Sequence, residues 1–531
     1  IIETKINGYK SKMIFQEKIA KELLEYNSRR EGPLLEGDER FVFRLGEKVP
    51  DNQISNFSVG MIPLVEKGIN SMLTKMLNSQ FVNKSVNHKK LSLNAIKNLN
   101  QIYLLYTNNY KNLKNDYYYF DYDLDNNLLG FEDDNKILIL DTYNLLIQSV
   151  NGQHGLAPSN RKFYWNGIEN YFEPITYDSN INLSIKPNFL RLPLSDQFEK
   201  SFINAINKLE SIDVDDIEVK MKKNGVLMEK KIINEKLNII TTNVKHLQNM
   251  YENMDKDLIK DNQNKMPDES LWVNFYKSLQ ETAPNTYIVK SNDINGNLNA
   301  FEKCKLFTLT CENLNLDNNQ INDLYEGSLI IDKEEYQYVG DKLYSENLIS
   351  ENQYKKSNIG NSTFFYNKGI TIDYLLDKKI LNITQNKVGA RAYFLNGYLD
   401  DLEINFIGFE NNVEKIPNFP IDIKTLTGCL SFINLELKNV NVNSSNSSCE
   451  DALNFINTTG NIKNIDIVSS YMDALDIDFS NIAIDNVAIE SAKNDCVDLS
   501  YGNYNIKNID VNNCGDKGLS VGEKSNLNVE N

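Results

Sequence analysis

Three aspartates and a lysine recur at one fixed interval near the end of this chain. Asp451, Asp473, Asp495 and Lys517 follow one another at intervals of 22 residues. If each interval is one coil of a solenoid, the four side chains form a line with a spacing of about 4.8 Å. Carboxylates that close raise one another's pKa, and the lysine lowers the pKa of its neighbour. Such a line can serve as an acid/base pair, bind a cation or a sugar, or act only as a charge ladder between coils.

A second group of polar residues flanks a predicted β-hairpin. Residues 161–172 place aromatic segments on both sides of an Asn-Gly pair, which is typical of a hairpin turn. Folding this hairpin brings Asn160 and Asp178 to the same open end, where an amide and a carboxylate can supply oxygen ligands to Mg²⁺ on nucleotide phosphates. His154, close by in sequence, is a candidate base. The alternative is that Asn160 and Asp178 only cap turns and that His154 is structural.

The aspartates belong to a longer repeat that predicts their scaffold. Two apolar columns recur in step with them: Leu453, Leu475, Val497 and Leu519, and Ile462, Ile484 and Ile506. A period in the twenties with short apolar strands is typical of a solenoid with one coil per repeat. We therefore predict a right-handed parallel β-helix, an all-β solenoid.

Two polar columns complete this repeat. Asn464, Asn486 and Asn508 recur between the apolar positions, which predicts an amide ladder at a turn. The column of Asn454, Asp476, Asp498 and Ser520 alternates with inward residues and is predicted to face solvent. Burying the Asp473 column inside the coil would be costly, so we place it at the corner where each strand begins.

The fold class is predicted to be multidomain. We expect an α+β domain over residues 1–190, a helical extension or spacer over 191–285, and the β-helix over 286–531. The chain begins at Ile1 without a methionine and ends at Asn531 in mid-repeat. We therefore expect a fragment truncated at both ends, for which a missing signal peptide carries no information about secretion.

The first region resembles the CotH kinase-like family of atypical secreted kinases. The similar motifs are residues 160–165 and 173–178, and the resemblance spans roughly residues 10–185. It implies a phosphotransferase that uses ATP and Mg²⁺, with Asn160 and Asp178 as metal ligands and Glu17 as partner of a phosphate-binding lysine. Gly155 stands where a kinase catalytic loop has its aspartate, so an inactive version is an alternative.

The repeats resemble polygalacturonase-type pectinases, which have the pectin lyase-like fold. Residues 472–476, 494–497 and 514–522 are similar to three of their motifs, in the same order and one coil apart. The resemblance implies that Asp473 and Asp495 hydrolyse a glycosidic bond, with Lys517 at the position of the family's histidine. Asn494 replaces the first of the paired aspartates, so the alternatives are Ca²⁺ or sugar binding at the aspartate column.

Taken together, the motifs resemble a bacterial group that joins a CotH-like domain to a β-helix. This implies a secreted or cell-envelope protein whose partner is a polysaccharide or a cell-surface protein. The net charge of -17 argues against nucleic acid as a partner, and no apolar run approaches the roughly 18 residues of a membrane helix. The six cysteines lack CxxC spacing, and we expect them to be buried free thiols.

Three functions stay open at this point. The first is a CotH-like phosphotransferase, active or degenerate, combined with a polysaccharide-associated β-helix. The second is a polygalacturonase-like hydrolase that acts through Asp473 and Asp495. The third is a structural surface protein without catalysis.

Overall fold

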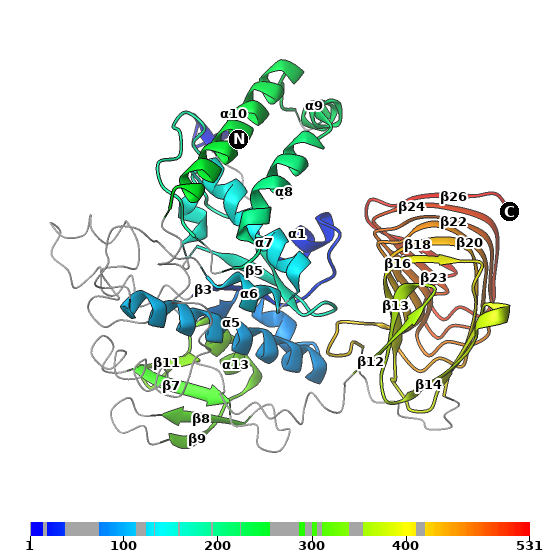
Figure 1. Cartoon of the computed structure of the whole chain (residues 1–531). Helices are drawn as coiled ribbons and strands as arrows, with labels where there is room; N and C mark the ends of the chain where they lie inside the picture. Colours follow the sequence, from blue (N-terminus) through cyan, green and yellow to red (C-terminus); the bar gives the residue numbers. More distant parts are fainter. Residues whose placement is uncertain are drawn as a thin grey trace. The chain divides into compact units, whose positions relative to one another are not determined.

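The computed structural model describes thirteen segments of the chain and divides it into two compact units. The described residues are 2–13, 18–37, 74–112, 124–131, 133–157, 160–192, 195–223, 225–254, 286–291, 300–304, 311–338, 354–409 and 420–531. Residues 1–31, 83–90 and 344–531 form one unit, here called the solenoid unit, and residues 32–82 and 91–343 form the other, here called the α/β unit (Figure 1).

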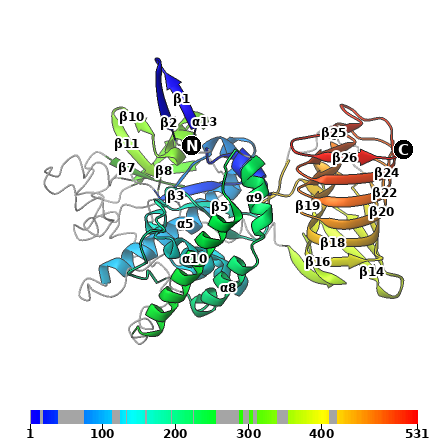
Figure 2. The ribbon, with the colours of Figure 1, turned by 90° about the horizontal axis from the view of Figure 1, so that it is seen from above.

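The solenoid unit contains the predicted parallel β-helix, with about six coils. Its long strand β18 (Gly428–Ser445) belongs to two stacks of parallel strands. Figure 2 shows the strands of successive coils lying one above another. The first stack continues through β19 (Asp451–Ile456), β21 (Asp473–Asp478), β23 (Val497–Ser500) and β25 (Leu519–Val521). The second continues through β20 (Thr459–Ile467), β22 (Asn481–Ile489), β24 (Asn503–Val511) and β26 (Asn526–Val529). Parallel pairing in register explains the 22-residue period, because each residue lies beside its equivalent one coil later.

Antiparallel hairpins precede the regular coils. They consist of β12 (Lys355–Ile359) with β13 (Asn361–Tyr366), and β14 (Ile370–Leu375) with β15 (Ile380–Gln385). Parallel pairing begins between β15 and β17 (Glu403–Ile407) and continues where β16 (Ala392–Asp400) and β17 pair with β18. Strand β15 therefore belongs both to a hairpin and to a parallel stack.

The interior of the β-helix is a stack of buried apolar columns. Both predicted columns are inside for most of their length, for example Leu475 and Ile484, although Leu519 in the last coil is 36% exposed. Phe394, Phe432 and Phe455 stack with centroids 5.4 and 4.4 Å apart and nearly parallel rings. Such aromatic pairs add about 0.5–1.5 kcal/mol each beyond the burial of their surface.

The asparagine ladder is confirmed and is longer than predicted. Each amide Nδ2 donates to the Oδ1 of the preceding coil, at 2.7, 2.9, 2.8 and 3.1 Å, along Asn441, Asn464, Asn486, Asn508 and Asn531. Asn464, Asn486 and Asn508 lie within strands and not at the predicted turn. Lys463 and Asn464 are consecutive residues, and neither is buried. The inward-outward alternation of the strand is therefore interrupted here, and the amide of Asn464 can bond to the asparagines of the adjacent coils.

The α/β unit is built on a four-stranded antiparallel sheet. Its order is β4 (Thr74–Met76), β3 (Leu34–Gly37), β5 (Lys162–Asn166) and β6 (Tyr171–Ile175). The hairpin predicted around the Asn-Gly pair is present as β5 and β6. The loop between them has four residues instead of two, and Asn170, with φ of 55°, takes the left-handed conformation.

The helices of this unit pack on one another, and the described helices within residues 191–285, expected to be a helical extension or spacer, are part of this packing. Helix α8 (Phe198–Glu210) and helix α10 (Lys230–Glu252) pack on helix α7 (Asp134–Ser149). The contact is a buried cluster that includes Leu145, Phe202, Val244 and Leu247. The remaining described α-helices of this unit are α6 (Asn126–Gly130), α9 (Val214–Lys223), α13 (Asn318–Glu326) and most of α5 (Val86–Asn112), whereas α1 (Lys21–Tyr26) belongs to the solenoid unit.

A separate five-stranded sheet occupies part of the region that we assigned to the solenoid. It comprises β7 (Thr286–Ser291), β8 (Ala300–Cys304), β9 (Cys311–Asn315), β10 (Ile330–Ile331) and β11 (Glu334–Tyr338). These strands pair only among themselves, and most of the pairs are antiparallel. The expectation that the solenoid begins at residue 286 was therefore wrong, since alternating strands and turns without the 22-residue period do not specify a coil.

All six cysteines are in disulfides, which corrects the expectation of free thiols. The pairs are Cys304–Cys311, Cys429–Cys449 and Cys496–Cys514. The last two pairs are separated by 20 and 18 residues, close to one coil. A coil returns the chain to nearly the same place after 22 residues, so cysteines at this separation meet across the corner of one coil.

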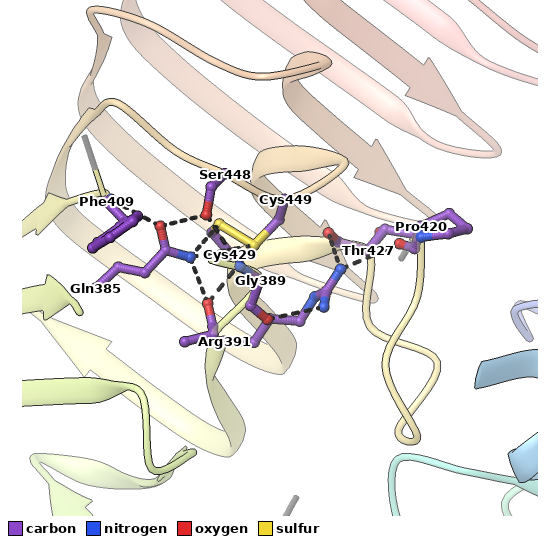
Figure 3. The surroundings of a disulfide bond; sticks show 10 residues. Gln385, Gly389, Arg391, Phe409, Pro420, Thr427, Cys429, Ser448 and Cys449 are labelled. Atoms are coloured by element: carbon purple, nitrogen blue, oxygen red, sulfur yellow. Dashed lines mark hydrogen bonds between the residues drawn. A yellow bond between two sulfur atoms is a disulfide. The ribbon is translucent and has the colours of Figure 1, made fainter. Parts of the chain in front are cut away.

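The buried side chain of Gln385 lies beside the disulfide of Cys429 and Cys449 and forms several hydrogen bonds there (Figure 3). The Nε2 of Gln385 donates to the carbonyl of Ala390 at 2.8 Å and to the Sγ of Cys429 at 3.2 Å. Its Oε1 accepts from the hydroxyl of Ser448 at 2.8 Å and from the N–H of Phe409 at 3.0 Å. Every polar atom of this buried amide therefore has a partner, as a closed interior requires.

Candidate functional site

The four residues of the aspartate column form the predicted line where each strand begins. Asp451 and Asp473 are the first residues of β19 and β21 and lie side by side in register. Asp495 lies two residues before β23 and Lys517 two residues before β25. The geometric part of the prediction is therefore confirmed.

Hydrogen bonds show how the column uses its carboxylates. The Oδ1 of Asp473 accepts from the backbone N–H of Asp495 at 2.8 Å and from the Nδ2 of Asn494 at 2.7 Å. Asp495 repeats the pattern, because its Oδ1 accepts from the N–H of Lys517 at 2.9 Å and its Oδ2 lies 3.3 Å from the Nζ of that lysine. The carboxylates of Asp473 and Asp495 thus connect their coils to the next, as a structural ladder would.

The second polar column lies on the outer surface of the same sheet. Asn454, Asp476 and Asp498 are paired in register on β19, β21 and β23, and Ser520 follows on β25. The Nδ2 of Asn454 donates to the Oδ2 of Asp476 at 2.8 Å. The prediction that this column faces solvent was wrong at one end, because Asn454 is fully buried.

Arg30 is the group that buries this end. Its Nη1 donates to the Oδ1 of Asn454 and its Nη2 to the Oγ1 of Thr427, both at 2.9 Å. Its Nε lies 3.9 Å from the Oδ2 of Asp478, and the two side chains are about 15% exposed. Arg30 therefore bridges residues from three successive coils of the sheet.

The residues before Arg30 also lie on the solenoid. The hydroxyl of Tyr501 donates to Glu25 at 3.2 Å, and the Nδ2 of Asn457 donates to the carbonyl of Ser28 at 3.4 Å. The Nζ of Lys524 lies 3.9 Å from the ring centroid of Tyr26. We call residues 21–30 the covering segment, since helix α1 and Arg30 together cover part of this face.

Burial and crowding raise the pKa values of the carboxyl groups beneath Arg30. Burial is the main cause for Asp476, whose pKa lies well above its usual range, with repulsion from Asp478 and Asp451 adding to it. Burial likewise raises the pKa of Asp451 to about 7, although Arg30 acts in the opposite direction. Burial is also the main cause of the raised pKa of Glu450.

Two buried carboxyl oxygens at this position accept no hydrogen bond. They are the Oδ2 of Asp451 and the Oε2 of Glu450. Asp451 is only 3% exposed. Unsatisfied buried acceptors are rare in folded proteins, so this group of carboxyls has more acceptor capacity than Arg30 fills.

Metal coordination was the alternative use of these carboxylates. In the part of the chain that the structure describes, no three side chains of His, Cys, Asp or Glu are grouped so that they could hold a metal ion. The carboxylates of Asp473 and Asp495 accept from neighbouring N–H groups instead. Ca²⁺ binding at the aspartate column, one of the alternatives from the sequence, stays a prediction.

The α/β unit brings three other predicted site residues together. The Nε2 of His154 lies 3.0 Å from the Nδ2 of Asn160 and 3.4 Å from the Oδ2 of Asp178. His154 comes from a short 3-10 helix, η3 (Gln153–Leu156), and the other two residues lie at the open end of the hairpin. The side chains of His154 and Asp178 are 51% and 60% exposed. Glu17 lies outside the described residues.

A buried group of charges beside this cluster was not found from the sequence. Glu36 on β3 pairs with Lys162 on β5 and with Lys75 on β4, the latter at 3.1 Å. The Nζ of Lys162 also lies 4.2 Å from the ring centroid of Tyr177, the residue before Asp178. No local signal could have identified the pair, because 126 residues separate Lys162 from Glu36.

No family model, no curated protein and no solved structure matches this chain. The resemblances to the CotH kinase-like family and to the polygalacturonases therefore depend on the quoted motifs alone. Within the described residues, none of the helices has the length and apolar character needed to cross a membrane.

Proposed function

We propose that this chain is a polysaccharide-binding protein whose binding surface is the outer face of β19, β21, β23 and β25. The observation that carries the proposal is the outward column of Asn454, Asp476, Asp498 and Ser520, with one polar side chain per coil. Amide, carboxyl and hydroxyl groups can donate to and accept from the hydroxyls of a sugar. Their spacing of about 4.8 Å is close to the length of one sugar ring, so a chain of sugars can follow the solenoid axis.

Binding is favoured over hydrolysis by the bonds of the inner column. Inverting hydrolysis needs one carboxylic acid and one carboxylate that are both free to reach the substrate. Asp473 accepts two hydrogen bonds from the next coil, and Asp495 is paired with Lys517. We therefore assign Asp473, Asp495 and Lys517 to the structural ladder, with hydrolysis through the two aspartates as the alternative.

The disulfides support the location in which such a protein would act. Stable disulfides form in oxidising compartments and are rare in the cytosol. All six cysteines of this chain are paired. This agrees with a secreted or cell-envelope protein, where polysaccharides and cell-surface proteins are the available partners.

A second candidate function, phosphoryl transfer, is favoured by the cluster in the α/β unit. Mg²⁺ is usually bound through one or two protein oxygens plus substrate phosphates and water, and Asn160 and Asp178 offer such a pair. Lys162, held by Glu36, lies beside this cluster through its contact with Tyr177. ATP with Mg²⁺ would supply the phosphoryl group, while Asp178 would hold the metal and His154 would accept the proton of an acceptor hydroxyl.

Affinity electrophoresis of the full chain in gels that contain neutral, acidic or amine-bearing polysaccharides tests the main proposal. We expect retardation by at least one polysaccharide class, and loss of that retardation in Asp498→Asn. Asp466→Asn is the matched control, because Asp466 is an exposed aspartate on β20 in the other stack. If no polysaccharide retards the wild-type chain, the proposal is wrong.

A further inference from the structure

The acidic residues around Arg30 indicate which class of polysaccharide the solenoid selects. We propose that the face carrying Asp476 and Asp498 binds a polysaccharide with free amino groups, and that Arg30 occupies the position of one such cation. This inference rests on the proposed polysaccharide binding and names its ligand class. Residues of the covering segment then compete with the ligand.

The charges on this face favour a cationic ligand. Asp476 and Asp498 stand on adjacent coils in register, and Asp478 lies two residues further along the strand of Asp476. The carboxyl groups of Glu450 and Asp451 are close enough to Arg30 for electrostatic interaction. A polymer of uronic acids would be repelled here, since like charges across an interface cost binding energy.

Arg30 shows that this site accepts a cation with several N–H donors. Its guanidinium donates to Asn454 and Thr427 and lies beside Asp478. A protonated amine has three donors and the same charge, so it can use the same acceptors. Because Arg30 comes from a segment more than 390 residues away in sequence, it is not part of the repeat that builds the face.

The unsatisfied oxygens give independent evidence for a ligand. The Oδ2 of Asp451 and the Oε2 of Glu450 are buried without a hydrogen-bond partner. The carboxyl groups of Asp451 and Glu450 interact electrostatically with Arg30 and with Asp473. A ligand with one amine and neighbouring hydroxyls on each ring would satisfy acceptors that one guanidinium leaves unfilled.

A line of acceptors over several coils matches a polymer better than a single small cation. The outward column carries a carboxyl on two adjacent coils, Asp476 and Asp498, between the amide of Asn454 and the hydroxyl of Ser520, so a chain of amine-bearing sugars can place an amine beside this pair. In this arrangement the position of the Arg30 guanidinium at Asn454 is the end of the line. Withdrawal of the covering segment adds this last position to the line.

Calorimetric titration of the full chain tests this inference with three oligosaccharides of equal length. The probes are β-1,4-linked glucosamine, its fully N-acetylated counterpart, and an oligogalacturonate. We expect the wild-type chain to bind the amine form, with affinity for the other two lower by about tenfold or more, as expected when a charge pair is lost. Arg30→Gln should bind the amine form about tenfold more tightly, an ordinary size for relief of internal competition.

Arg30→Gln keeps a donor for Asn454 or Thr427 and removes the charge, so it is the primary variant. Arg30→Ala is the second variant, and circular dichroism of each protein establishes that the fold is present. Equal binding of the amine and N-acetyl forms, preference for the galacturonate, or weaker binding by both folded variants would overturn the inference and leave polysaccharide binding intact. Preference for an arginine-rich peptide over the amine oligosaccharide would overturn it in favour of a protein ligand. Absence of binding to all three oligosaccharides and to the polysaccharides of the electrophoresis would refute the proposed function itself.

Discussion

The two candidate sites differ in how their charges are held. In the solenoid unit, Asp451, Asp476 and Asp478 crowd together beneath one arginine, and burial raises their pKa values. In the α/β unit, the side chains of His154 and Asp178 are more than half exposed, and the Nε2 of His154 lies 3.4 Å from the Oδ2 of Asp178. The buried carboxyl groups of the solenoid unit favour binding of a cation. The exposed side chains of the α/β unit offer ligand atoms whose positions a bound nucleotide would have to fix.

The two sites also differ in how strongly a mutation in them should change stability. Buried, crowded charges are coupled to folding, so mutations there change both properties. Exposed polar clusters can be altered with little effect on stability.

Truncation of the stacked aromatic column should have the largest effect. Phe432 is fully buried between Phe394 and Phe455. Phe432→Ala should lower the unfolding free energy of the solenoid unit by about 3–5 kcal/mol, since it loses burial and leaves a cavity. Urea unfolding followed by circular dichroism measures the change, and a loss below about 1 kcal/mol would show that the column is not packed as described.

Removal of Arg30 should be the next largest effect, and it should depend on pH. Arg30→Ala leaves Asp478 and its neighbours without their cation, which should cost about 3 kcal/mol at pH 8. The raised pKa of Asp451, about 7, means that the folded state retains a proton that the unfolded state releases. Stability from this group is therefore fully present below its unfolded pKa and is lost as pH rises through 7.

Loss of Arg30 should raise these carboxyl pKa values further, because Arg30 is a group that lowers them. Unfolding free energies of wild type and Arg30→Ala, measured at pH 5 and pH 8, should differ more at the higher pH. Arg30→Lys is the matched control that keeps the charge. An equal difference at both pH values would contradict the electrostatic account of these carboxyl groups.

A single break in the asparagine ladder should have a smaller effect. Asn486 donates to Asn464 and accepts from Asn508, and all three bonds of the exposed ladder around it are similar. Asn486→Ala should cost about 1 kcal/mol, the usual net value of a hydrogen bond at a partly exposed position. Chemical denaturation is sufficient to measure it, and a loss as large as that of Phe432→Ala would mean that the ladder, and not the apolar core, holds the coils.

The smallest effect on stability is expected in the α/β unit. Asp178→Asn should change the unfolding free energy by less than about 0.5 kcal/mol, because the side chain is exposed and asparagine tolerates the left-handed backbone at φ of 41°. If this cluster binds Mg²⁺-ATP, the thermal shift produced by the nucleotide should be lost or strongly reduced in Asp178→Asn and persist in the control Asp134→Asn on α7. An undiminished shift in Asp178→Asn would remove the Asp178 carboxylate from the site.

The sequence predicted the solenoid well because its repeat is local and regular. Alternation within each 22-residue coil identified the buried leucines, the asparagine ladder and the line of Asp473 and Asp495. The cover on Asn454 could not be predicted, since Arg30 lies outside the repeat. The pair of Lys162 and Glu36 could not be predicted either, because the two residues are distant in sequence and meet only through antiparallel strands.

The disulfides were a different kind of error, because a signal for them existed. Cys429 and Cys449, like Cys496 and Cys514, are separated by slightly less than one coil. In a solenoid of known period, this separation predicts proximity across a corner. The absence of CxxC spacing argues only against a metal site, whereas the period of the coil itself indicates these two disulfides.

The inner column of Asp473 and Asp495 and the outer column of Asp476 and Asp498 have different roles, and one paired measurement tests this difference. Polysaccharide binding and urea unfolding should be measured for Asp498→Ala and Asp473→Ala in parallel. We predict that Asp498→Ala loses binding with a stability change below about 1 kcal/mol, while Asp473→Ala keeps binding and loses about 2 kcal/mol, since two donors of the next coil lose their acceptor. The reverse result, with binding lost in Asp473→Ala and retained in Asp498→Ala, would contradict the assignment and favour a catalytic or binding role for the inner column.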